Sequence, residues 1–542
     1  MKRPHRVLVV DDQQIWRETL RKALQGHGCL VDLAESTSEA LEALEHNFYH
    51  LLVVDIRLVD ADETNTEGME LLNELSRRGL TGGVEVIMLS AYGTMDQMRE
   101  SFTQYDVADF ASKNNFLDVD FLKQVDKVFT TRVEVNLDLR IDWEKGYEPK
   151  QLVVGVLLGK DRVKRDTDLQ ALAATELEDL LCRLFSNANH LFVSSLSTGQ
   201  SGASVLWSQP FYDTGGARPV VVKFGDFRSI DGEYQNFHKY VQPFITGGRS
   251  TSIPNGGLQR TVRLGGIIYT LLGADVNQLQ SFGRFYGRSE ATEIIRVLDQ
   301  LFTDTCSAWY SSPGRSQPLN LTEDYQRLLG FTIEKLEADL SNLKSVQGKH
   351  KLKFNSLGDE RNFTNPLFEM HEQKFIKSSY VTITHGDFNE TNILVDDSGH
   401  TWLIDFGRTG MGHILRDVAE LDSVVRYKLL AAGDATLEER LRLEEALCNT
   451  RHFRELDKLA SSFKTDNPAV EKAFLVTLHL RRIAQKIVPP QPNDDMGEYY
   501  IALLYNAVNT LRFYSLDPIQ RQHSLLSASL LTDQLAQASR LL

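Results

Sequence analysis

The chain has 542 residues, with 59 lysines and arginines against 74 aspartates and glutamates, and a formal net charge of −15. This charge excludes a nucleic-acid binder that works through a generally basic surface. Hydrophobic residues make up 42% of the sequence, which is enough for packed cores and too much for a disordered chain. At about 100–200 residues per domain, the length predicts roughly three domains.

No segment of the sequence indicates export or a membrane span. The basic start is followed by an apolar run over residues 7–10 only, which is too short for a signal peptide. The apolar stretch over residues 262–276 contains two charged residues and is too short to cross a bilayer. The four cysteines are scattered without metal-site spacing, as in a protein with reduced thiols. We therefore expect a cytoplasmic protein without a membrane partner.

Residues 1–130 alternate short apolar strands with amphipathic helices. Strands are expected at residues 7–10, 51–54 and 84–89, and helices near residues 15–24 and 39–45, the second after a capping box at residues 36–39. Continuous apolar strands alternating with helices predict an α/β fold, with a doubly wound parallel sheet covered on both faces. In such sheets the functional residues lie at the carboxyl ends of the strands.

Five polar residues fall at that edge of the expected sheet: Asp11, Asp12, Asp55, Ser90 and Lys113. Converging carboxylates repel one another and need a cation, most simply Mg²⁺. A carboxylate held in this way can accept a phosphoryl group, whose oxygens the lysine and the serine hydroxyl can contact. The pattern therefore predicts a Mg²⁺-dependent phosphoryl acceptor.

This segment resembles a response-regulator receiver domain, whose fold is a five-stranded parallel sheet. The resemblance implies that Asp55 is the phospho-acceptor, that Asp11 and Asp12 hold Mg²⁺ with it, and that Ser90 and Lys113 contact the phosphoryl group. It also implies a cognate sensor histidine kinase as a partner, and it leaves open a homodimer through this domain.

Three further positions bear on the resemblance to receiver domains. Phe110 lies at the family's aromatic switch position, three residues before the lysine. Asn114 stands where the family usually has proline. The loop after Asp55 is long and acidic, since Gly68 lies 13 residues further on. This loop can alter access to the acceptor or the choice of partner.

Residues 131–190 carry no catalytic pattern and are expected, by position, to connect or couple two domains. Apolar and polar residues alternate over 133–143, and residues 151–158 form a second apolar run. These patterns predict a hairpin that turns at residues 145–147. The spacing over residues 175–185 predicts an amphipathic helix.

Two patterns between residues 191 and 275 fit a nucleotide-binding lobe, and each also fits an ordinary structure. Gly199, Ser201 and Gly202 lie in a run of small residues whose backbone N–H groups can approach phosphates, although a hairpin turn has the same composition. Lys223 lies in the apolar run 220–224, and Glu233 can hold it towards phosphates. An edge-strand lysine and a surface glutamate are the alternatives.

Two stronger motifs follow, HGDFNETN at residues 385–392 and LIDFG at residues 403–407. The first follows an expected strand at residues 381–384. A hairpin that turns at residues 396–399 brings Asn392 and Asp405 close together, with Asp387 beside them. One carboxylate can then orient or deprotonate a hydroxyl, while an amide and a second carboxylate hold Mg²⁺ on the phosphates of a nucleotide.

This half resembles the aminoglycoside/choline phosphotransferase superfamily, and closely resembles the phosphotransferase-like domains of bacterial signalling proteins that are called ternary-complex-associated. The resemblance implies a bilobal α+β protein-kinase-like fold, with an N-lobe over residues 191–275 and a largely helical C-lobe over residues 276–542. An insertion is expected near residues 346–380. His385 and Asp417, the latter in a segment similar to the family's Asp-Leu-Ala, are implied to support the catalytic loop.

The resemblance to this superfamily implies ATP and Mg²⁺ as cofactors. Asp387 is implied as the catalytic base, Lys223 as the phosphate-binding lysine, and Asn392 with Asp405 as the metal ligands. The other implied nucleotide-binding residues have three roles. The phosphate-covering loop contains Gly199, Ser201 and Gly202, and Glu233 is the partner of the lysine. The interlobe hinge contains Leu271, Leu272 and Gly273. The loop departs from the G-x-G-x-x-G pattern of kinases. Further helices are expected over residues 290–309, 324–343, 438–447, 470–487 and 499–514.

These patterns predict a two-component response regulator in which phosphorylation of Asp55 controls an ATP- and Mg²⁺-dependent phosphotransferase. Its acceptor is an unidentified hydroxyl-bearing substrate or a signalling partner protein. The alternative is a catalytically weak or inactive kinase-like scaffold that recruits signalling partners under receiver control. A DNA-binding regulator is disfavoured by the net charge and by the lack of a helix-turn-helix pattern, so no nucleic-acid partner is expected.

Overall fold

The computed structural model describes residues 3–58, 67–91, 105–114, 116–146, 148–156, 167–197, 203–245, 250–274, 278–339, 350–354, 357, 361–490 and 494–539. The chain divides into two compact units. The first consists of Met1–Tyr234 with Ser252–Thr270, and the second of Gln235–Thr251 with Leu271–Leu542. Each unit is described by itself.

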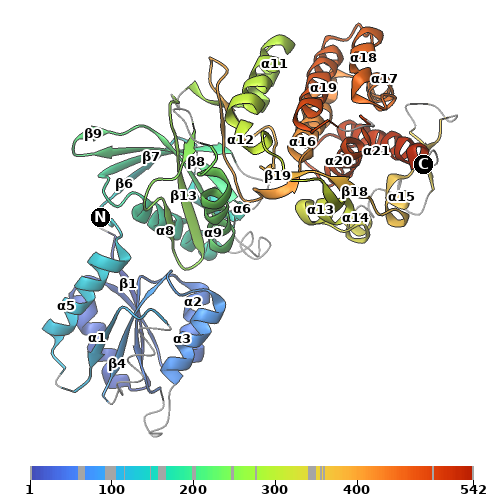
Figure 1. Ribbon diagram of the computed structural model, residues 1–542. Helices are drawn as coiled ribbons and strands as arrows, with labels where there is room; N and C mark the ends of the chain where they lie inside the picture. Colours follow the sequence, from blue (N-terminus) through green and yellow to red (C-terminus); the bar gives the residue numbers. More distant parts are fainter. Residues whose placement is uncertain are drawn as a thin grey trace. The chain divides into compact units, whose positions relative to one another are not determined.

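The first unit begins with a five-stranded parallel sheet of order β2-β1-β3-β4-β5. Its strands are β1 (Arg6–Val10), β2 (Leu30–Ala34), β3 (Leu51–Asp55), β4 (Glu85–Ser90) and β5 (Asp109–Ser112). Figure 1 shows α1 (Gln14–Gly26) and α5 (Asp118–Val128) on one face, and α2 (Thr37–His46) and α3 (Glu67–Arg78) on the other. The α/β fold predicted for this part is confirmed.

The strands of this sheet are apolar at successive positions because alternate side chains face opposite helix layers. Val7 and Val9 pack in the core cluster that contains residues of α1 and α5, whereas Leu8 and Val10 pack in the cluster of α2 and α3. A strand covered on both faces is therefore apolar at successive positions. At the start of α2, the Ser36 hydroxyl accepts the N–H of Glu39 (3.2 Å), so the predicted cap is present.

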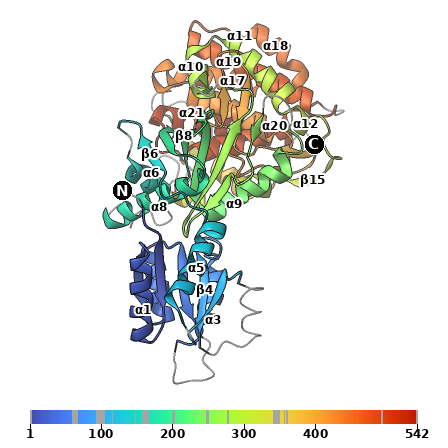
Figure 2. The same ribbon diagram turned by 90° about the vertical axis from the view of Figure 1, so that its left-hand side faces the viewer.

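The rest of the first unit is built on a second sheet in which β13, β10, β8 and β7 run antiparallel and β6 joins β7 in parallel. These strands are β6 (Arg140–Trp143), β7 (His190–Ser197), β8 (Ala203–Tyr212), β10 (Val220–Asp226) and β13 (Leu264–Leu271). Helix α8 (Thr167–Leu184) lies against this sheet (Figures 1 and 2), and Leu177, Leu180, Leu181 and Leu184 are buried in the cluster that it shares with the strands. The predicted helix at 175–185 is thus present and begins earlier.

The hairpin predicted over residues 133–158 is wrong. Phe129–Val133 continues α5 as a π-helical turn, and Pro149–Val156 forms helix α6. Among the described residues of this stretch, only Arg140–Trp143 is a strand. Leu152, Val153 and Val156 lie on one face of α6 and are buried in the same cluster as α8. Their spacing is helical, and an apolar run of eight residues does not by itself distinguish a buried helix from a strand.

The second unit contains several small antiparallel sheets of two or three strands and many helices. The strand predicted at 381–384 is β19 (Val381–Thr384), which pairs with β22 (Gly410–His413). The predicted hairpin is formed by β20 (Ile393–Val395) and β21 (Thr401–Leu403) and turns at residues 396–399. The strands on either side of the two motifs therefore lie where the sequence places them.

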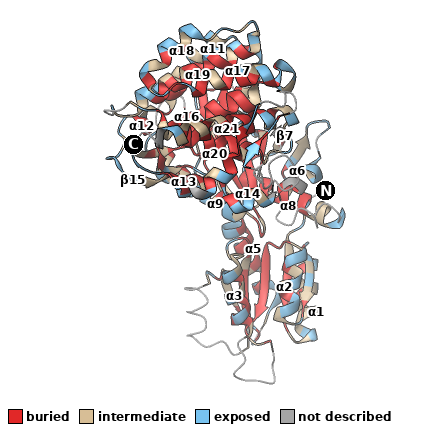
Figure 3. Cartoon of the chain, turned by 90° about the vertical axis from the view of Figure 1, so that its right-hand side faces the viewer, coloured by how far each residue is buried: buried red, intermediate tan, exposed pale blue. Residues whose placement is uncertain are grey.

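The helices of the second unit match the sequence in part. Gly330, with φ 68°, ends α13 (Leu321–Leu329) and separates it from α14 (Ile333–Asp339), so the single helix predicted over 324–343 is wrong. The sequence did not predict α21 (Pro518–Ser539), because buried serines interrupt its apolar pattern. This helix packs against α20 (Gly497–Thr510), and Figure 3 shows both helices buried over most of their length. The remaining predicted segments contain α11 (Ala291–Gln300), α17 (Leu437–Cys448) and α19 (Pro468–Ile487).

The region near 346–380 was expected to be an irregular insertion. Its described part contains α15 (Pro366–Glu372) and β18 (Ile376–Ser379), and β18 pairs with β15 (Gln317–Asn320). The region is therefore more regular than its polar composition indicated. None of the described helices, in either unit, combines the length and the apolar character that a bilayer span requires.

A buried charge cluster fixes the packing of α16 (Arg416–Val424), α19 and α20. Asp422 accepts a hydrogen bond from Arg426 Nε (2.5 Å) and one from the Tyr499 hydroxyl (2.8 Å), and Arg481 Nε lies 3.3 Å from its second oxygen. All four side chains are fully buried. Arg426 Nη1 also lies 2.6 Å from Oε2 of the fully buried Glu444, so two carboxylates balance two guanidinium groups that water cannot reach.

Asp422→Asn is expected to lower the free energy of unfolding by about 3–5 kcal/mol, because it leaves the buried guanidinium group of Arg481 without the carboxylate that it pairs with. Differential scanning calorimetry measures the change. Asp457→Asn is the matched control, since Asp457 pairs with Arg482 at the surface with its side chain 89% exposed, and no measurable change is expected there. Equal effects of the two substitutions would contradict the structural role of the cluster.

Candidate functional site

Three carboxylates gather at the carboxyl end of the parallel sheet. Asp11 and Asp12 follow β1, Asp55 ends β3, and one oxygen of each lies within 4.8 Å of the others. Lys113 follows β5, and its Nζ lies 2.7 Å from Asp11 Oδ2 and 2.7 Å from Asp55 Oδ2. Ser90 ends β4, but its side chain lies outside the described part of the chain. The structure therefore brings together four of the five residues singled out in the sequence.

The electrostatics of this cluster are set by burial. Burial raises the pKa of Asp55 to about 6 and also raises the pKa of Asp11, while the hydrogen bonds from Lys113 oppose both shifts. Burial disfavours the charge of Lys113, but the two carboxylates outweigh this effect and raise its pKa. Three mutually repelling carboxylate groups are a ligand set that Mg²⁺ prefers, so these residues fit the expected ion.

The other predicted receiver positions surround this cluster. Phe110, the expected switch residue, lies on β5 and is half-buried against the core of α2 and α3. The side-chain amide of Asn114 donates to the Ala91 carbonyl (2.6 Å) and so ties the lysine loop to the end of β4. Gly68 opens α3, and a Cβ there would lie 2.1 Å from the Asp55 carbonyl oxygen, so only glycine fits. Residues 59–66 of the acidic loop lie outside the described residues.

Lys223 and Glu233 form a buried ion pair in the first unit. Lys223 lies on β10, Glu233 lies on α9 (Phe227–Asn236), and Lys223 Nζ is 2.5 Å from Glu233 Oε2. The Tyr269 hydroxyl donates to the other oxygen of Glu233. Both charged side chains are buried, so the pair itself holds the ammonium group in place. The expected phosphate-covering residues, Gly199, Ser201 and Gly202, lie outside the described residues.

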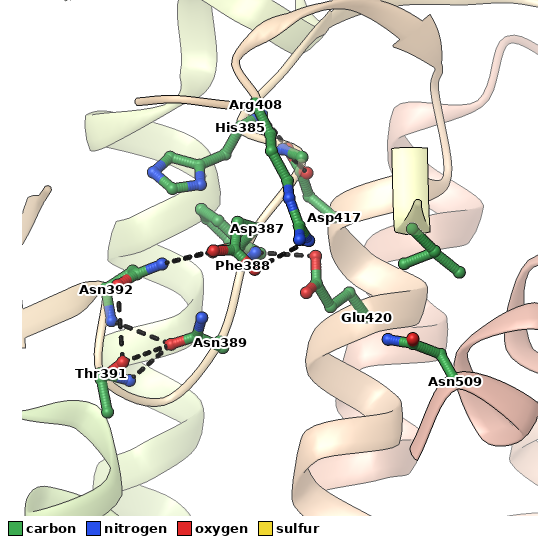
Figure 4. Close-up of polar contacts among 12 residues, drawn as sticks. His385, Asp387, Phe388, Asn389, Thr391, Asn392, Arg408, Asp417, Glu420 and Asn509 are labelled. Atoms are coloured by element: carbon green, nitrogen blue, oxygen red, sulfur yellow. Dashed lines mark hydrogen bonds and ion pairs between the residues drawn. The ribbon is translucent and has the colours of Figure 1, made fainter. Parts of the chain in front are cut away.

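In the second unit, the turn that carries Asp387 is fastened by Asp417 of α16. The carboxylate of Asp417 accepts the backbone N–H of His385 (2.7 Å) and that of Gly386 (2.9 Å), as Figure 4 shows. Gly386 has φ 77°, and a Cβ there would lie 2.6 Å from the Arg408 carbonyl oxygen. The fully buried His385 ring is hydrogen-bonded to the Ile404 carbonyl (3.1 Å).

Asn392 and Asp405 lie beside this turn. The side-chain amide of Asn392 donates to the carbonyl of Asp387 (2.9 Å) and to its carboxylate (3.2 Å). The Asn392 carbonyl accepts the N–H of Ile404 (3.1 Å), which places the next residue, Asp405, at the same end of the hairpin. Asp405 has φ 71°, a strained conformation for a residue other than glycine and one that is concentrated at functional sites. Amide and carboxylate oxygens are a donor set that fits Mg²⁺.

Two residues near Asp387 were missed by sequence reasoning. Arg408 Nη1 lies 3.4 Å from Asp387 Oδ1, and Glu420 accepts the N–H of Phe388 (2.7 Å) (Figure 4). Burial and the nearby charge of Asp387 raise the pKa of Glu420 to about 8. The one signal in the sequence was that Glu420 follows Asp417 by three positions, which places both on one face of a helix.

The expected hinge is engaged in bonds within the second unit. The N–H of Leu272 donates to the Ser250 carbonyl (2.9 Å), and its carbonyl accepts the indole N–H of Trp402 (2.9 Å). Leu271 ends β13, and Gly273 has φ 75°. An adenine nitrogen that accepts the N–H of Leu272 must therefore displace the bond to Ser250, whereas the Leu272 carbonyl has a second lone pair for another donor.

Two known families match separate parts of the chain. Residues 7–124 match the family described as "Response regulator receiver domain". Residues 188–353 and 359–512 match the family described as "Ternary complex associated domain 9". The first match agrees with the parallel sheet and its carboxylate cluster, so the first 130 residues contain a receiver domain.

Curated relatives and solved structures match the receiver part. "Response regulator MprA" of Mycobacterium sp. (strain KMS) is 31% identical over 94 residues, which are 17% of this chain and 38% of the relative. An "Uncharacterized 14.6 kDa protein in sodA1 3'region" of Leptolyngbya boryana is 31% identical over 103 residues, 18% of this chain and 75% of that protein. A CheY-like receiver domain protein from Methanospirillum hungatei JF-1 is similar with a TM-score of 0.22 and 25% identity, over 24% of this chain and 97% of that chain. The chain thus spans less than half the length of the MprA relative.

In the absence of nucleotide, Mg²⁺ is expected to raise the melting temperature more at pH 8 than at pH 5. The folded-state pKa of Asp55, about 6, exceeds the ordinary aspartate value of 3.8, so without metal the stability falls as the pH rises between these two values. Mg²⁺ offsets this loss only where the carboxylate is ionised. A thermal-shift titration measures the effect, and Asp11→Ala, which removes a ligand, should abolish it. A Mg²⁺ effect that is independent of pH, or that survives in Asp11→Ala, would contradict the assigned site.

Proposed function

Because the chain belongs to the ternary complex associated domain 9 family and also carries a receiver domain, we propose that it is a two-component response regulator whose receiver controls an ATP- and Mg²⁺-dependent phosphotransferase. The receiver half of this proposal names a sensor histidine kinase as the phosphoryl donor and Asp55 as the acceptor. The output half names a hydroxyl group of a small molecule or a partner protein as the final acceptor.

The receiver half is supported by the position of Lys113. Its ammonium group touches both Asp11 and Asp55, so it already lies where the oxygens of a transferred phosphoryl group need positive charge. Asp11, Asp12 and Asp55 would hold Mg²⁺, which neutralises negative charge on the acceptor and the phosphoryl group. Transfer to Asp55 then requires positioning and charge stabilisation from residues that are already in place.

The contact between Asn392 and Asp387, in a turn that Asp417 fastens, is the observation that carries the output half. In the proposal, Asp387 accepts the proton of the acceptor hydroxyl. Asn392 and Asp405 hold Mg²⁺, which neutralises charge on the phosphates of ATP. Lys223, held by Glu233, contacts a phosphate.

Glu420 supports the assignment of Asp387 as a base. The pKa of Glu420 is raised to about 8, so this carboxyl is mostly neutral at pH 7. A neutral Glu420 adds no like charge beside Asp387, the carboxylate that the proposal assigns as proton acceptor.

A receiver-controlled scaffold is the second candidate function. It is favoured by the ion pair between Arg408 and Asp387, which occupies the expected base, and by the bonds that engage both backbone groups of Leu272. In this alternative the output region recruits a signalling partner and transfers no phosphoryl group.

Isothermal titration calorimetry of the full chain with Mg-ATP tests the first proposal, with and without beryllofluoride as a mimic of phospho-Asp55. Asp405→Ala is expected to lose Mg-ATP binding, because it removes a metal ligand. Asp387→Asn is expected to keep binding and to lower γ-phosphate release or transfer by about 10²–10⁴-fold, the usual contribution of a general base.

Asp397→Asn is the matched control for these variants, since Asp397 lies in the turn of the same hairpin with its side chain 62% exposed, and both properties should be unchanged. Transfer that survives in Asp387→Asn would contradict the assigned base. Absence of Mg-ATP binding in both receiver states would favour the scaffold.

A further inference from the structure

Helix α3 runs from the phospho-acceptor to the second sheet of the first unit. At its start, the N–H of Gly68 donates to the Ile56 carbonyl (3.0 Å), and the space for a Cβ at Gly68 is taken by the carbonyl of Asp55. The helix has 12 residues, which corresponds to about 18 Å. Its buried side chains, Met69, Leu71, Leu72 and Leu75, pack into the receiver core. Helix α3 therefore touches the acceptor strand at one end and reaches the far end of the receiver at the other.

The carboxyl end of α3 is held by two arginines of the second sheet region. Arg228 Nη2 donates to the carbonyl of Arg78 (3.0 Å), the last residue of α3. The guanidinium of Arg260 donates to the carbonyls of Gly79 (2.8 Å) and Thr81 (3.0 Å). The last carbonyls of a helix lack partners within it and carry partial negative charge, so two cations stabilise this end.

These contacts form part of a close interface within the first unit. A Cβ at Gly83 of the receiver would lie 2.5 Å from the Thr261 carbonyl oxygen, and Val262 is buried in the receiver core. Thr261 is fixed in turn by the fully buried carboxylate of Glu176, which accepts its hydroxyl (2.7 Å). Burial lowers the pKa of Arg260 only to about 10, so this arginine stays charged in the interface at neutral pH.

Arg228 also belongs to the helix that carries Glu233. Arg228 lies in the first turn of α9, and Glu233 lies five residues further on in the same helix. Helix α9 packs closely on β13, since a Cβ at Gly265 would lie 3.0 Å from Cα of Phe227. A displacement of the first turn of α9 therefore moves the whole helix, and with it the carboxylate that holds Lys223.

The charge of Arg228 is unfavourable for α9 alone. The amino end of a helix carries partial positive charge, and a cation there is destabilising. Its guanidinium instead reaches the carboxyl end of α3, where positive charge is favourable.

We propose that α3 and the two arginines Arg228 and Arg260 transmit the state of Asp55 to α9, and so set the position of the Lys223–Glu233 pair. A phosphoryl group and Mg²⁺ at the end of β3 displace the first turn of α3, which Gly68 holds against Asp55. The displaced carboxyl end of α3 pulls on Arg228 and thereby on α9. Only the consequence for catalysis rests on the proposed function, since it requires that Lys223 contact a nucleotide.

Hydrogen–deuterium exchange of the full chain in Mg²⁺, with and without beryllofluoride, tests this route without any nucleotide. In the unsubstituted protein, uptake is expected to change both at the end of β3 with the start of α3 and in residues 227–236. In Arg228→Gln and in the double variant with Arg260→Gln, the first change should remain and the second should be lost. Arg228 is exposed, so its single substitution leaves the fold intact.

Two further variants make this test specific. Arg218→Gln removes an exposed arginine between β8 and β10 that no described contact joins to the receiver, and both changes should persist. Gly83→Ala alters the shape of the interface and no charge, and it should weaken the response of α9. A receiver response without a response of α9 in the unsubstituted protein would overturn the proposal, as would a full α9 response in the double variant.

Calorimetry with Mg-ATP separates this proposal from the proposed function. If α9 responds as described and Mg-ATP does not bind, the route stands and the phosphotransferase fails. If Mg-ATP binds and α9 does not respond to a loaded receiver, the phosphotransferase stands and the route is overturned.

Discussion

A carboxylate that is held out of water must be balanced by a cation or by hydrogen-bond donors, and this requirement fixes the geometry of the candidate sites. In the receiver, one ammonium group, that of Lys113, balances Asp11 and Asp55 at 2.7 Å from each. In the second unit, Asp417 is balanced by two backbone N–H groups and by the Tyr310 hydroxyl (2.6 Å). These three hydrogen bonds hold the turn that presents Asp387 against α16.

The same requirement makes the receiver site responsive. A phosphoryl group on Asp55 brings new negative charge next to a lysine that is already shared between two carboxylates. In the proposed route, Lys113 and any bound Mg²⁺ would then contact more oxygens, and the strand ends that carry these groups would shift together. At Gly68 no side chain separates the first turn of α3 from the backbone of Asp55, as this route requires.

The sequence was most informative where structure depends on neighbours in the chain. Four continuous apolar residues identify the strand that ends in the candidate acceptor Asp55. The motif that ends in Asn392 likewise identifies a candidate site residue and the strand that begins directly after it. Prediction failed over residues 149–156, where a short apolar run fits both helix and strand, and at α21, whose buried serines give it no apolar stripe. In both cases tertiary packing decides the outcome, and the local pattern does not record it.

Contacts between residues far apart in the chain account for the rest of what the sequence could not show. Arg228 and the receiver carbonyl that it binds are 150 positions apart, and Arg260 is 179 and 181 positions from the two carbonyls that it binds. Neither arginine has a motif around it, and an exposed arginine on a helix is ordinary in composition. The positive charge of Arg228 is unfavourable at the amino end of α9, and it is favourable at the carboxyl end of α3 that its guanidinium group contacts. The first turn of α9 is therefore shaped by the receiver as much as by its own sheet, and receiver and sheet region constitute one compact unit of the protein.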